Sequence, residues 1–400
     1  MSRRTKTILH CDLDAFFCSV ESLLNPGLEG RAFVVGGAAD GRGVVSSASY
    51  AAREFGIRSA MPTAQALRKA PDLIVISPQH AQYSKHSQEI MSFLRDSAPV
   101  VEQLSIDEAF LDVSDDPRTG LEVAQYLQGE ILENLKLPTS WGVASNKLVA
   151  KIATEVGKPR GLIVVPPGQE AVFLAPLPVR MLWGVGPKTA ERLAARDVHT
   201  IGGLAGMSSR SLNESLGDLG LELASRARGE DDRPVVEGRD PKSMSAERTF
   251  NADIADWPEL RTVILRLSET VGRRLRKAKL AGYTIRVKVR WPDFTTLTRQ
   301  VRLEQPTDRE RIIFDESCKL FQGFWKKNQA VRLLGVGVLD LHEPIRQLGL
   351  FDRTWDRDER LQQAVDSIRN QYGPDSLRRA GGIRNQAAAG SNEQPEEDLR

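Results

Sequence analysis

Three carboxylates at the ends of predicted strands are the residues of this 400-residue chain best placed to do chemistry. Asp12 lies where the apolar run ILHCDL ends, and the adjacent pair Asp107 and Glu108 lies between two further apolar runs. A strand-end Asp often only caps the next helix, and an adjacent acidic pair also occurs in ordinary turns. Adjacent carboxylates repel, however, and both stay ionised at low cost only when they are exposed or bound to a cation. The pattern therefore favours a metal site built from two strand ends.

A second set of residues has the chemistry of a phosphate-binding site. Tyr50 and Arg53 are three residues apart on a helix predicted from Ser49 to Pro62, so they share one face of it. A tyrosine hydroxyl beside a guanidinium suits a phosphate group. Lys158 lies in the rigid turn GKPRG, from which its ammonium can be aimed at a phosphate. Taken alone, each feature is also explained by a surface Tyr–Arg pair or by a plain loop lysine.

The elements around these residues predict an α+β fold. A buried strand is expected at 7–13 and a helix at 15–24, and strands then alternate with helices to about residue 170. Strands interleaved with helices, with acids at two strand ends, indicate a palm-like sheet.

The character of the chain changes at about Glu170, where short helices with glycine turns replace the strand pattern. The segment from Leu182 to Ser208 resembles a helix-hairpin-helix, with a tight GVG turn between two helices. Backbone N–H groups at such a turn can bind a DNA phosphate whatever the base sequence. The same pattern also fits a glycine-capped helical turn. The candidate DNA contacts here are Gly184, Gly186 and Lys188.

A third unit follows a polar, proline-bounded run that begins near Glu230. Its order of strand, helix, two strands, helix and strand predicts a β-α-β-β-α-β unit. Residues 240–342 contain 20 Lys and Arg against 13 Asp and Glu, a net charge of +7, whereas the whole chain carries only +2. On one strand Arg286, Lys288 and Arg290 alternate and so share a face, which suits contact with a DNA backbone. Charge alone fits a solvated basic face equally well.

Composition bounds the class of protein. The cysteines Cys11, Cys18 and Cys318 have no zinc-ligand spacing and fit a reducing compartment. No apolar run approaches the roughly 18 residues of a membrane span, and the N-terminus lacks the apolar region of a secretory signal. We expect a soluble, cytoplasmic protein without a membrane partner.

The polar tail beyond His342 contains one short apolar peptide, QLGLF, at 347–351. Apolar residues this close to a polar tail are poor candidates for the core. Gln347, Leu350 and Phe351 instead suit a docking peptide whose side chains fill a partner's pocket.

Together these motifs resemble those of the Y-family DNA polymerases, the translesion enzymes, and within them the bacterial DNA polymerase IV type. The resemblance rests on DLDAFF, SYAAR, SIDEAFLD, GVASNKLVAKIATEVGKPRG and GVG, in the order and spacing of that family from the N-terminus to about residue 342. QLGLF is similar to a bacterial sliding-clamp-binding peptide.

The resemblance implies roles for single residues. Asp12 and Asp107 would bridge two Mg²⁺ ions. Glu108 would bind the ion near the primer end, and the Leu13 carbonyl would bind the ion on the nucleotide side. Hard oxygen ligands of this kind suit Mg²⁺. Asp14 would be structural. In the nucleotide site, Tyr50, Arg53 and Lys158 would hold the triphosphate. Phe17 would be a steric gate against a 2′-hydroxyl, and the adjacent Phe16 would lie nearer the apolar core. Ala15 stands where relatives often carry Cys or Tyr.

The resemblance also implies a multidomain, right-hand polymerase that lacks proofreading and copies DNA with low fidelity. The expected partners are primer–template DNA, deoxynucleoside triphosphates and a sliding clamp, and we expect a monomer. The predicted parts are palm at 1–22 and 85–170, fingers at 23–84, thumb at 171–235, linker at 236–243, little finger at 244–342, and a tail at 343–400.

Two other functions compete with this interpretation. A non-catalytic DNA-binding accessory on the same fold has no need for Asp12, Asp107 and Glu108 together. A nucleotidyl cyclase can share a metal-binding palm, but the helix-hairpin-helix and the basic C-terminal unit argue against it.

Overall fold

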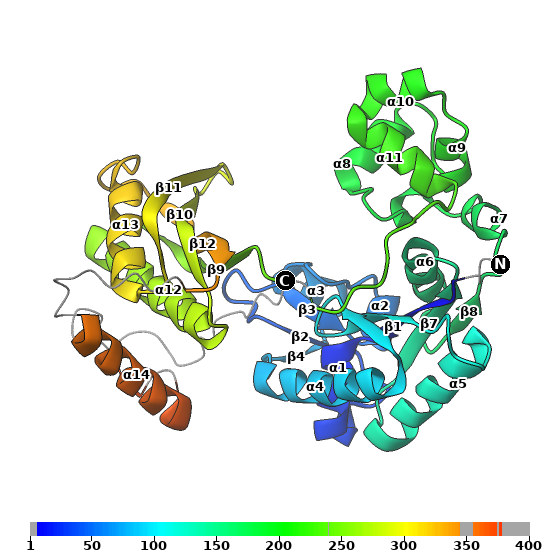
Figure 1. Ribbon diagram of the computed structural model, residues 1–400. Helices are drawn as coiled ribbons and strands as arrows, with labels where there is room; N and C mark the ends of the chain where they lie inside the picture. The colour runs from blue at the N-terminus through cyan, green and yellow to red at the C-terminus, as the bar shows by residue number, and fades with distance from the viewer. Residues whose placement is uncertain (1–5, 239, 345–354, 374–375, 378–400) are drawn as a thin grey trace. The chain divides into compact units, whose positions relative to one another are not determined.

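The computed structural model describes residues 6–238, 240–344, 355–373 and 376–377 (Figure 1). The chain divides between residues 239 and 240 into two compact units, which are treated separately below. The predicted linker at 236–243 contains this division. Both units combine helices with sheets, so the predicted α+β class is confirmed.

The first unit is built on a five-stranded sheet whose middle strand is β1 (Ile8–Leu13). The order is β5-β6-β1-β7-β8, and all neighbours are antiparallel except β7 and β8. Every residue of β1 is buried, because both faces of the sheet are covered. The other strands are β5 (Val100–Gln103), β6 (Glu108–Asp112), β7 (Thr139–Ala144) and β8 (Leu162–Val164).

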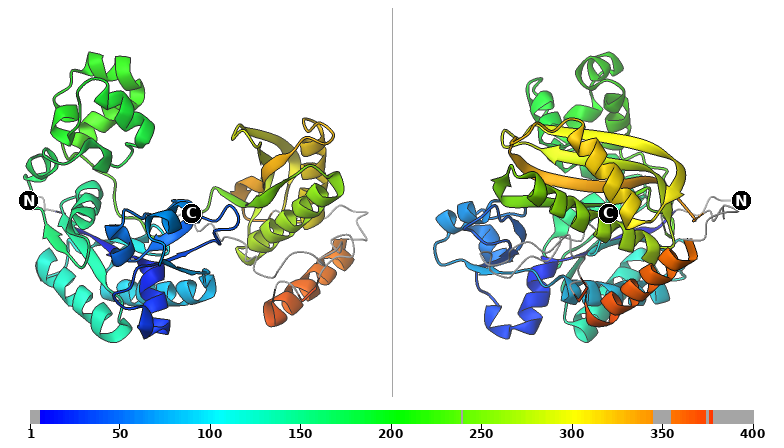
Figure 2. Two further views of the ribbon diagram at one scale, coloured as in Figure 1. Left: turned by 180° about the vertical axis from the view of Figure 1, so that it is seen from behind. Right: turned by 90° about the vertical axis from the view of Figure 1, so that its left-hand side faces the viewer.

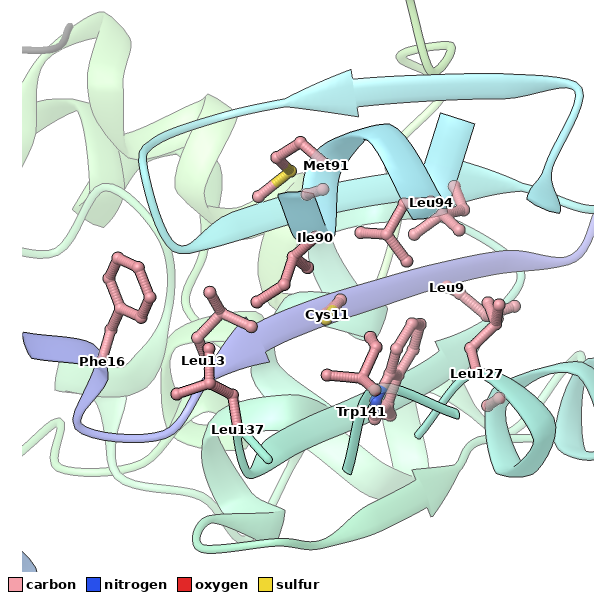
Figure 3. Close-up of a cluster of buried hydrophobic side chains, with 14 of the residues drawn as sticks. Leu9, Cys11, Leu13, Phe16, Ile90, Met91, Leu94, Leu127, Leu137 and Trp141 are labelled. Carbon is pink, nitrogen blue, oxygen red and sulfur yellow. The ribbon is translucent and has the colours of Figure 1, made fainter. Parts of the chain in front are cut away.

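One face of this sheet carries the larger apolar core. Side chains alternate along a strand, so Leu9, Cys11 and Leu13 point to the same side. Figure 3 shows them packed against Met91 of α4 and Trp141 of β7. The helices on this side are α1 (Phe16–Leu24), α4 (His80–Ser97) and α5 (Gly120–Glu130), which continues as a π-helical turn at Ile131–Leu135.

Helix α6 (Lys147–Gly157) covers the other face. Its apolar side chains share one core with the helices that follow residue 170, so the sheet and the predicted thumb are packed together. Those helices match the short helices expected there: α7 (Glu170–Leu174), the 3₁₀ turn Val179–Met181, α8 (Pro187–Ala194), α9 (Ile201–Ala205), α10 (Ser209–Leu216) and α11 (Asp218–Ala227).

The predicted fingers have a small core of their own around a three-stranded sheet of order β3-β2-β4. The single helix predicted from Ser49 to Pro62 is wrong in its length, because α2 ends at Glu54. Gly56 follows with φ of +71°, a left-handed conformation that stops an α-helix. The elements are a 3₁₀ turn at Pro26–Leu28, β2 (Phe33–Gly36), β3 (Val45–Ala48), α2 (Tyr50–Glu54), α3 (Thr63–Lys69) and β4 (Ile74–Ile76).

The second unit confirms the predicted β-α-β-β-α-β order. Its sheet has the order β11-β10-β12-β9, and α12 and α13 pack on one face of it (Figure 2). A further helix, α14 (Trp355–Tyr372), lies on the helical side of this unit. The remaining bounds are β9 (Ser243–Ile254), α12 (Trp257–Lys277), β10 (Ala281–Arg290), β11 (Thr296–Thr307), α13 (Glu310–Gln322) and β12 (Val331–His342).

In the part of the chain that the structure describes, no helix combines the length and the apolar character needed to cross a lipid bilayer.

A buried ion pair fixes α6 to the sheet edge. Lys147 Nζ lies 2.5 Å from Glu102 Oε2, and the two side chains are only 1% and 3% exposed. The same carboxylate oxygen accepts the backbone N–H of Val236 at 3.1 Å, and Lys147 donates to the carbonyl of Pro234 at 3.3 Å. The pair therefore joins β5, α6 and the segment that leads out of the first unit.

Replacing Lys147 by Met should lower the free energy of unfolding of the first unit by about 3–5 kcal/mol, because the Glu102 carboxylate stays buried without its cation. Adding Glu102→Leu should restore more than half of that loss, since both charges are then absent. Urea unfolding of the single and double variants measures this, with exposed Lys69→Met as the control. A single variant as stable as the wild type would contradict the account.

Candidate active site

The two acidic strand ends meet in the structure. The antiparallel register of β1 and β6 places Asp12 directly opposite Glu108, so both side chains project from the same face of the sheet. Asp107 precedes β6, and its carbonyl accepts the N–H of Leu13 at 3.0 Å. This is the face covered by α6. The sequence therefore identified the three carboxylates and their meeting point.

Glu108 is held by two basic groups that the sequence did not single out. Its Oε2 lies 3.3 Å from His10 Nε2 and is also bonded by Lys151 Nζ. Burial alone would raise the pKa of Glu108, but the His10 hydrogen bond and the Lys151 charge outweigh it and lower the pKa to about 2. His10 is buried, which lowers its pKa to about 4, so the imidazole is neutral at pH 7.

Asp12 has a different environment. It is 7% exposed, and its Oδ2 accepts a hydrogen bond from Lys158 Nζ at 2.8 Å. Burial raises the pKa of Asp12 to about 7 although Lys158 opposes the shift, and burial also raises the pKa of Asp107. Burial would lower the pKa of Lys158, but attraction to Asp12 and Glu155 outweighs it and raises the pKa.

Several of these groups come from one face of α6. Lys147, Lys151 and Thr154 follow the helical spacing i, i+4 and i+7, and all three contact the sheet. Lys158 is the first residue after the helix and also contacts the sheet. Thr154 Oγ1 lies 2.9 Å from His10 Nδ1. The spacing is visible in the sequence, and it was the signal available for finding Lys151.

A divalent cation fits the chemistry of the donors. The set offers three carboxylates and the carbonyl of Leu13, all hard oxygen donors. The raised pKa values of Asp12 and Asp107 mean that both carboxyls would gain from a nearby positive charge. Among the described residues, no three or more His, Cys, Asp or Glu side chains are already arranged to hold a metal. Lys158 and Lys151 each engage one of the three carboxylates.

Asp14 organises the turn between β1 and α1. It is 1% exposed and accepts hydrogen bonds from Tyr50 Oη at 3.0 Å, from Ser140 Oγ at 2.9 Å and from the N–H of Arg160 at 2.7 Å. All these donors belong to the protein, which supports a structural role. Ala15, the next residue, has φ of +45°, a left-handed conformation that is uncommon for a residue other than glycine.

The predicted phosphate-binding residues of the fingers lie together. The guanidinium of Arg53 is 4.6 Å from the centre of the Tyr50 ring, and Arg53 Nε donates to the carbonyl of Ala48 at 3.0 Å. Tyr50 bonds Asp14 and Lys158 bonds Asp12, so both groups belong to the neighbourhood of the β1 turn. Burial and the nearby Asp14 raise the pKa of Tyr50, which keeps its hydroxyl protonated as a donor.

Phe17 is backed by a second aromatic ring that the sequence did not indicate. Tyr83 of α4 stacks on Phe17 with ring centres 4.2 Å apart and planes 12° from parallel. The Tyr83 hydroxyl donates to buried Glu21 at 2.5 Å, which fixes the ring. His80 meets the edge of Phe17. Phe16 is 3% exposed and lies in the core, as expected.

The helix-hairpin-helix candidates are exposed at the start of α8. Gly184 has φ of +104°, which only glycine adopts readily, and Gly186 is the N-cap of α8. Lys188 lies in the first turn of the helix. All three are accessible to a ligand.

The basic strand of the second unit has the predicted alternation. Arg286, Lys288 and Arg290 lie on the open face of β10, while the residues between them are buried. A groove of about 200 Å³ runs over this face, and Gly335 and Gly337 of β12 line it. The charges are partly engaged: Lys288 Nζ lies 2.8 Å from Glu247 Oε2, Arg286 bonds Gln300, and Arg290 bonds Thr296. The predicted clamp-binding residues Gln347, Leu350 and Phe351 lie outside the described residues.

Three families of sequences match this chain. The impB/mucB/samB family matches residues 11–155, the IMS family HHH motif matches 167–207, and the impB/mucB/samB family C-terminal domain matches 241–350. A DNA polymerase IV from Desulfatibacillum aliphaticivorans is 41% identical over 373 residues, which cover 92% of this chain and 94% of the relative. DNA polymerase IV 1 from Bacillus subtilis (strain 168) is 35% identical over 393 residues, with 96% and 95% covered.

Solved structures are similar as well. A Y-family DNA polymerase chimera of Dbh and Dpo4 superposes with a TM-score of 0.74 at 28% identity, covering 84% of this chain and 98% of the chimera. An insertion ternary complex of Dbh DNA polymerase gives 0.62 at 27% identity, with the same coverage.

Proposed function

We propose that this chain, which belongs to the impB/mucB/samB family and is a Y-family DNA polymerase of the bacterial polymerase IV type, builds its catalytic centre from Asp12, Asp107 and Glu108. It is a DNA-directed DNA polymerase of translesion synthesis and DNA repair, with DNA and deoxynucleoside triphosphates as partners. Polymerases of this family generally use divalent metal ions. The alternative of a non-catalytic accessory is not favoured.

The observation that carries the catalytic assignment is the pairing of Asp12 with Glu108 across β1 and β6, with Asp107 beside them. We assign Asp12 and Asp107 as ligands shared by two Mg²⁺ ions, Glu108 as the ligand near the primer end, and the Leu13 carbonyl as a ligand on the nucleotide side. When bound, the two ions supply positive charge at the attacking and leaving oxygens of the displacement.

The bases around Glu108 act as positioning groups in this proposal. Lys151 and His10 both bond Glu108 Oε2, and Thr154 holds the far side of the His10 ring. Because the low pKa keeps Glu108 ionised, the carboxylate is ready to act as a ligand at neutral pH.

Lys158, Tyr50 and Arg53 hold the triphosphate. Lys158 now pairs with Asp12 and Tyr50 with Asp14. Both donors therefore point at the carboxylate cluster, and each exchanges its carboxylate partner for a phosphate oxygen when the nucleotide binds.

Phe17 is the steric gate, held in place by Tyr83 and, through the Tyr83 hydroxyl, by Glu21. Because the ring is packed between Tyr83 and the edge of His80, it has little room to move away from an added 2′-hydroxyl.

DNA is held at two surfaces that carry no catalytic acids. The N–H groups near Gly184 and Gly186, with Lys188, suit a backbone phosphate at the start of α8. Arg286 and Lys288 line the groove on this sheet face, and Arg290 lies on the same side of the strand, so the three suit contact with the DNA backbone. We further propose that QLGLF binds a sliding clamp and that the chain acts as a monomer.

Asp107→Ala should reduce primer extension with Mg²⁺ by at least about 100-fold, because one shared metal ligand is lost. The assay is single-nucleotide incorporation on a primed template, together with fluorescence anisotropy to show that DNA binding is retained. Asp96→Ala, an exposed acid on α4, is the matched control. Extension at the wild-type rate would refute the metal assignment.

Phe17→Ala should relax discrimination against ribonucleotides by roughly 10- to 100-fold, since a clash in a packed site costs typically 1–3 kcal/mol. Tyr83→Leu should act in the same direction with a smaller effect, because the gate loses its support. The ratio of kcat/KM for deoxynucleotide and ribonucleotide measures both, and exposed Tyr126→Leu controls for loss of an aromatic ring. An unchanged ratio in Phe17→Ala would exclude the gate.

Glu247→Gln should strengthen DNA binding and steepen its salt dependence by about 0.9 in the log–log slope, because Lys288 is freed for a phosphate. Arg286→Gln should make the slope shallower by a similar amount. Lys319→Gln on α13, on the other side of the second unit, should leave the slope unchanged. If neither substitution alters the slope, this sheet face does not contact DNA.

A further inference from the structure

Helix α14 is docked on the second unit by polar side chains. Asp366 forms two hydrogen bonds with Arg276 of α12, at 2.6 and 3.0 Å. Gln362 donates to Glu310 Oε1 at 3.0 Å. Arg369 is buried and lies 3.4 Å from Glu269 Oε1 and 3.7 Å from Glu310 Oε1. The contacts follow the spacing i, i+4 and i+7, so they define one face of the helix.

A second face of α14 is apolar and exposed. Leu361, Ile368 and Tyr372 are 64%, 39% and 69% exposed, and partly buried Val365 lies between them. Their spacing of i, i+4, i+7 and i+11 makes them one stripe, roughly a quarter turn round the helix from the docked face. The apolar core of the second unit, within the described residues, contains no side chain of α14. The helix thus uses ion pairs to dock and leaves its hydrophobic stripe uncovered, the reverse of an ordinary amphipathic helix.

The charge of α14 argues against two classes of occupant. The helix contains three arginines and four acidic residues, a net charge of −1. Interfacial membrane helices and surfaces that bind nucleic acid are rich in Lys and Arg. The stripe therefore fits the surface of a protein.

The size of the stripe argues against a stable dimer of two copies. From Leu361 to Tyr372 it is only about 18 Å long at 1.5 Å per residue. A stable interface uses roughly 20–30 residues and about 800 Å² on each side. The stripe is therefore one part of a larger contact, and a second part must come from elsewhere.

The same stretch of chain supplies that second part. Phe351, the last residue of QLGLF, is ten residues before Leu361. We propose that the stripe Leu361, Val365, Ile368 and Tyr372 binds an apolar patch of the sliding clamp beside the pocket that receives QLGLF. This rests on the clamp contact proposed above. Two linked contacts of this kind bind more tightly than either alone, because the second forms at a high effective concentration.

The docked face of α14 fixes the position of the helix on the second unit. Arg276 and Glu310 hold the helix against α12 and α13, so the stripe is presented from the folded unit. In the sequence, residues 347–351 lie between β12, which ends at His342, and α14, which begins at Trp355. The two proposed clamp contacts therefore follow each other closely along the chain.

Surface-immobilised clamp and the full-length chain test this proposal. Leu361→Gln with Tyr372→Gln should weaken clamp affinity by about 5- to 30-fold, mainly through faster dissociation. Leu350→Ala with Phe351→Ala should abolish binding. Val172→Gln, which removes another exposed apolar side chain (68%), should bind as the wild type does. Primer extension without clamp and thermal unfolding should be unchanged in the stripe variant and in Val172→Gln, since Leu361, Tyr372 and Val172 lie outside the described cores.

The outcomes separate the two proposals. If the stripe variant binds as the wild type does while the peptide variant fails, the stripe inference is overturned and the clamp peptide stands. If the peptide variant also binds normally, the proposed clamp contact itself is wrong. Sedimentation tests the other occupant: a wild-type dimer that becomes a monomer in the stripe variant, with clamp affinity unchanged, would assign the stripe to a second copy of the chain.

Discussion

The structure of the first unit depends on how three neighbouring carboxyl groups are accommodated at a buried strand end. Burial and mutual repulsion raise the pKa values of Asp12 and Asp107. Two lysines lie against these acids: Lys151 of α6 bonds Glu108, and Lys158, the residue after α6, bonds Asp12. The order β6-β1-β7 brings the acids together under this helix. Since α6 also shares its apolar core with the following helices, the electrostatics of the site and the packing of the thumb depend on one element.

Lys151 and Lys158 have different roles because they bond different carboxylates. Lys151 and neutral His10 bond the same oxygen of Glu108, and together they give that carboxylate a pKa of about 2. Lys158 comes from the turn after α6 and divides its ammonium between Asp12 and Glu155. A metal cation bound to Asp12 would take the place of the Lys158 ammonium there and free that ammonium to bind a phosphate. Lys158 would therefore couple the proposed metal ligand Asp12 to the proposed triphosphate site, whereas Glu108 keeps its partners Lys151 and His10.

The sequence predicted the parts of this site that depend on local pattern. The strand ends, the three acids and the alternation of Arg286 with its neighbours needed only apolar runs and a period of two. His10 and Tyr83 were missed for a common physical reason: each matters because of a partner that is distant in the chain, Glu108 and Phe17 respectively. A predicted strand does not say which face of it a helix will cover. The docking of α14 through Arg369 could not be foreseen from the sequence. An amphipathic pattern predicts burial of the apolar stripe, whereas here ion pairs dock the helix by another face.

The turn that follows β1 connects the proposed metal ligand Asp12 with the proposed gate Phe17. Asp12 precedes this turn and Phe17 follows it, and Ala15 between them holds a left-handed conformation that a side chain other than glycine adopts at a cost. Hydrogen bonds to Asp14 offset this cost. Its buried carboxylate accepts hydrogen bonds from Tyr50 of the fingers, from Ser140 of β7 and from Arg160 of the GKPRG turn. Each of these segments also contributes to, or adjoins, the proposed nucleotide site. One buried carboxylate thus ties the turn to all three segments, so the positions of the acids, of Phe17 and of the proposed phosphate ligands are linked.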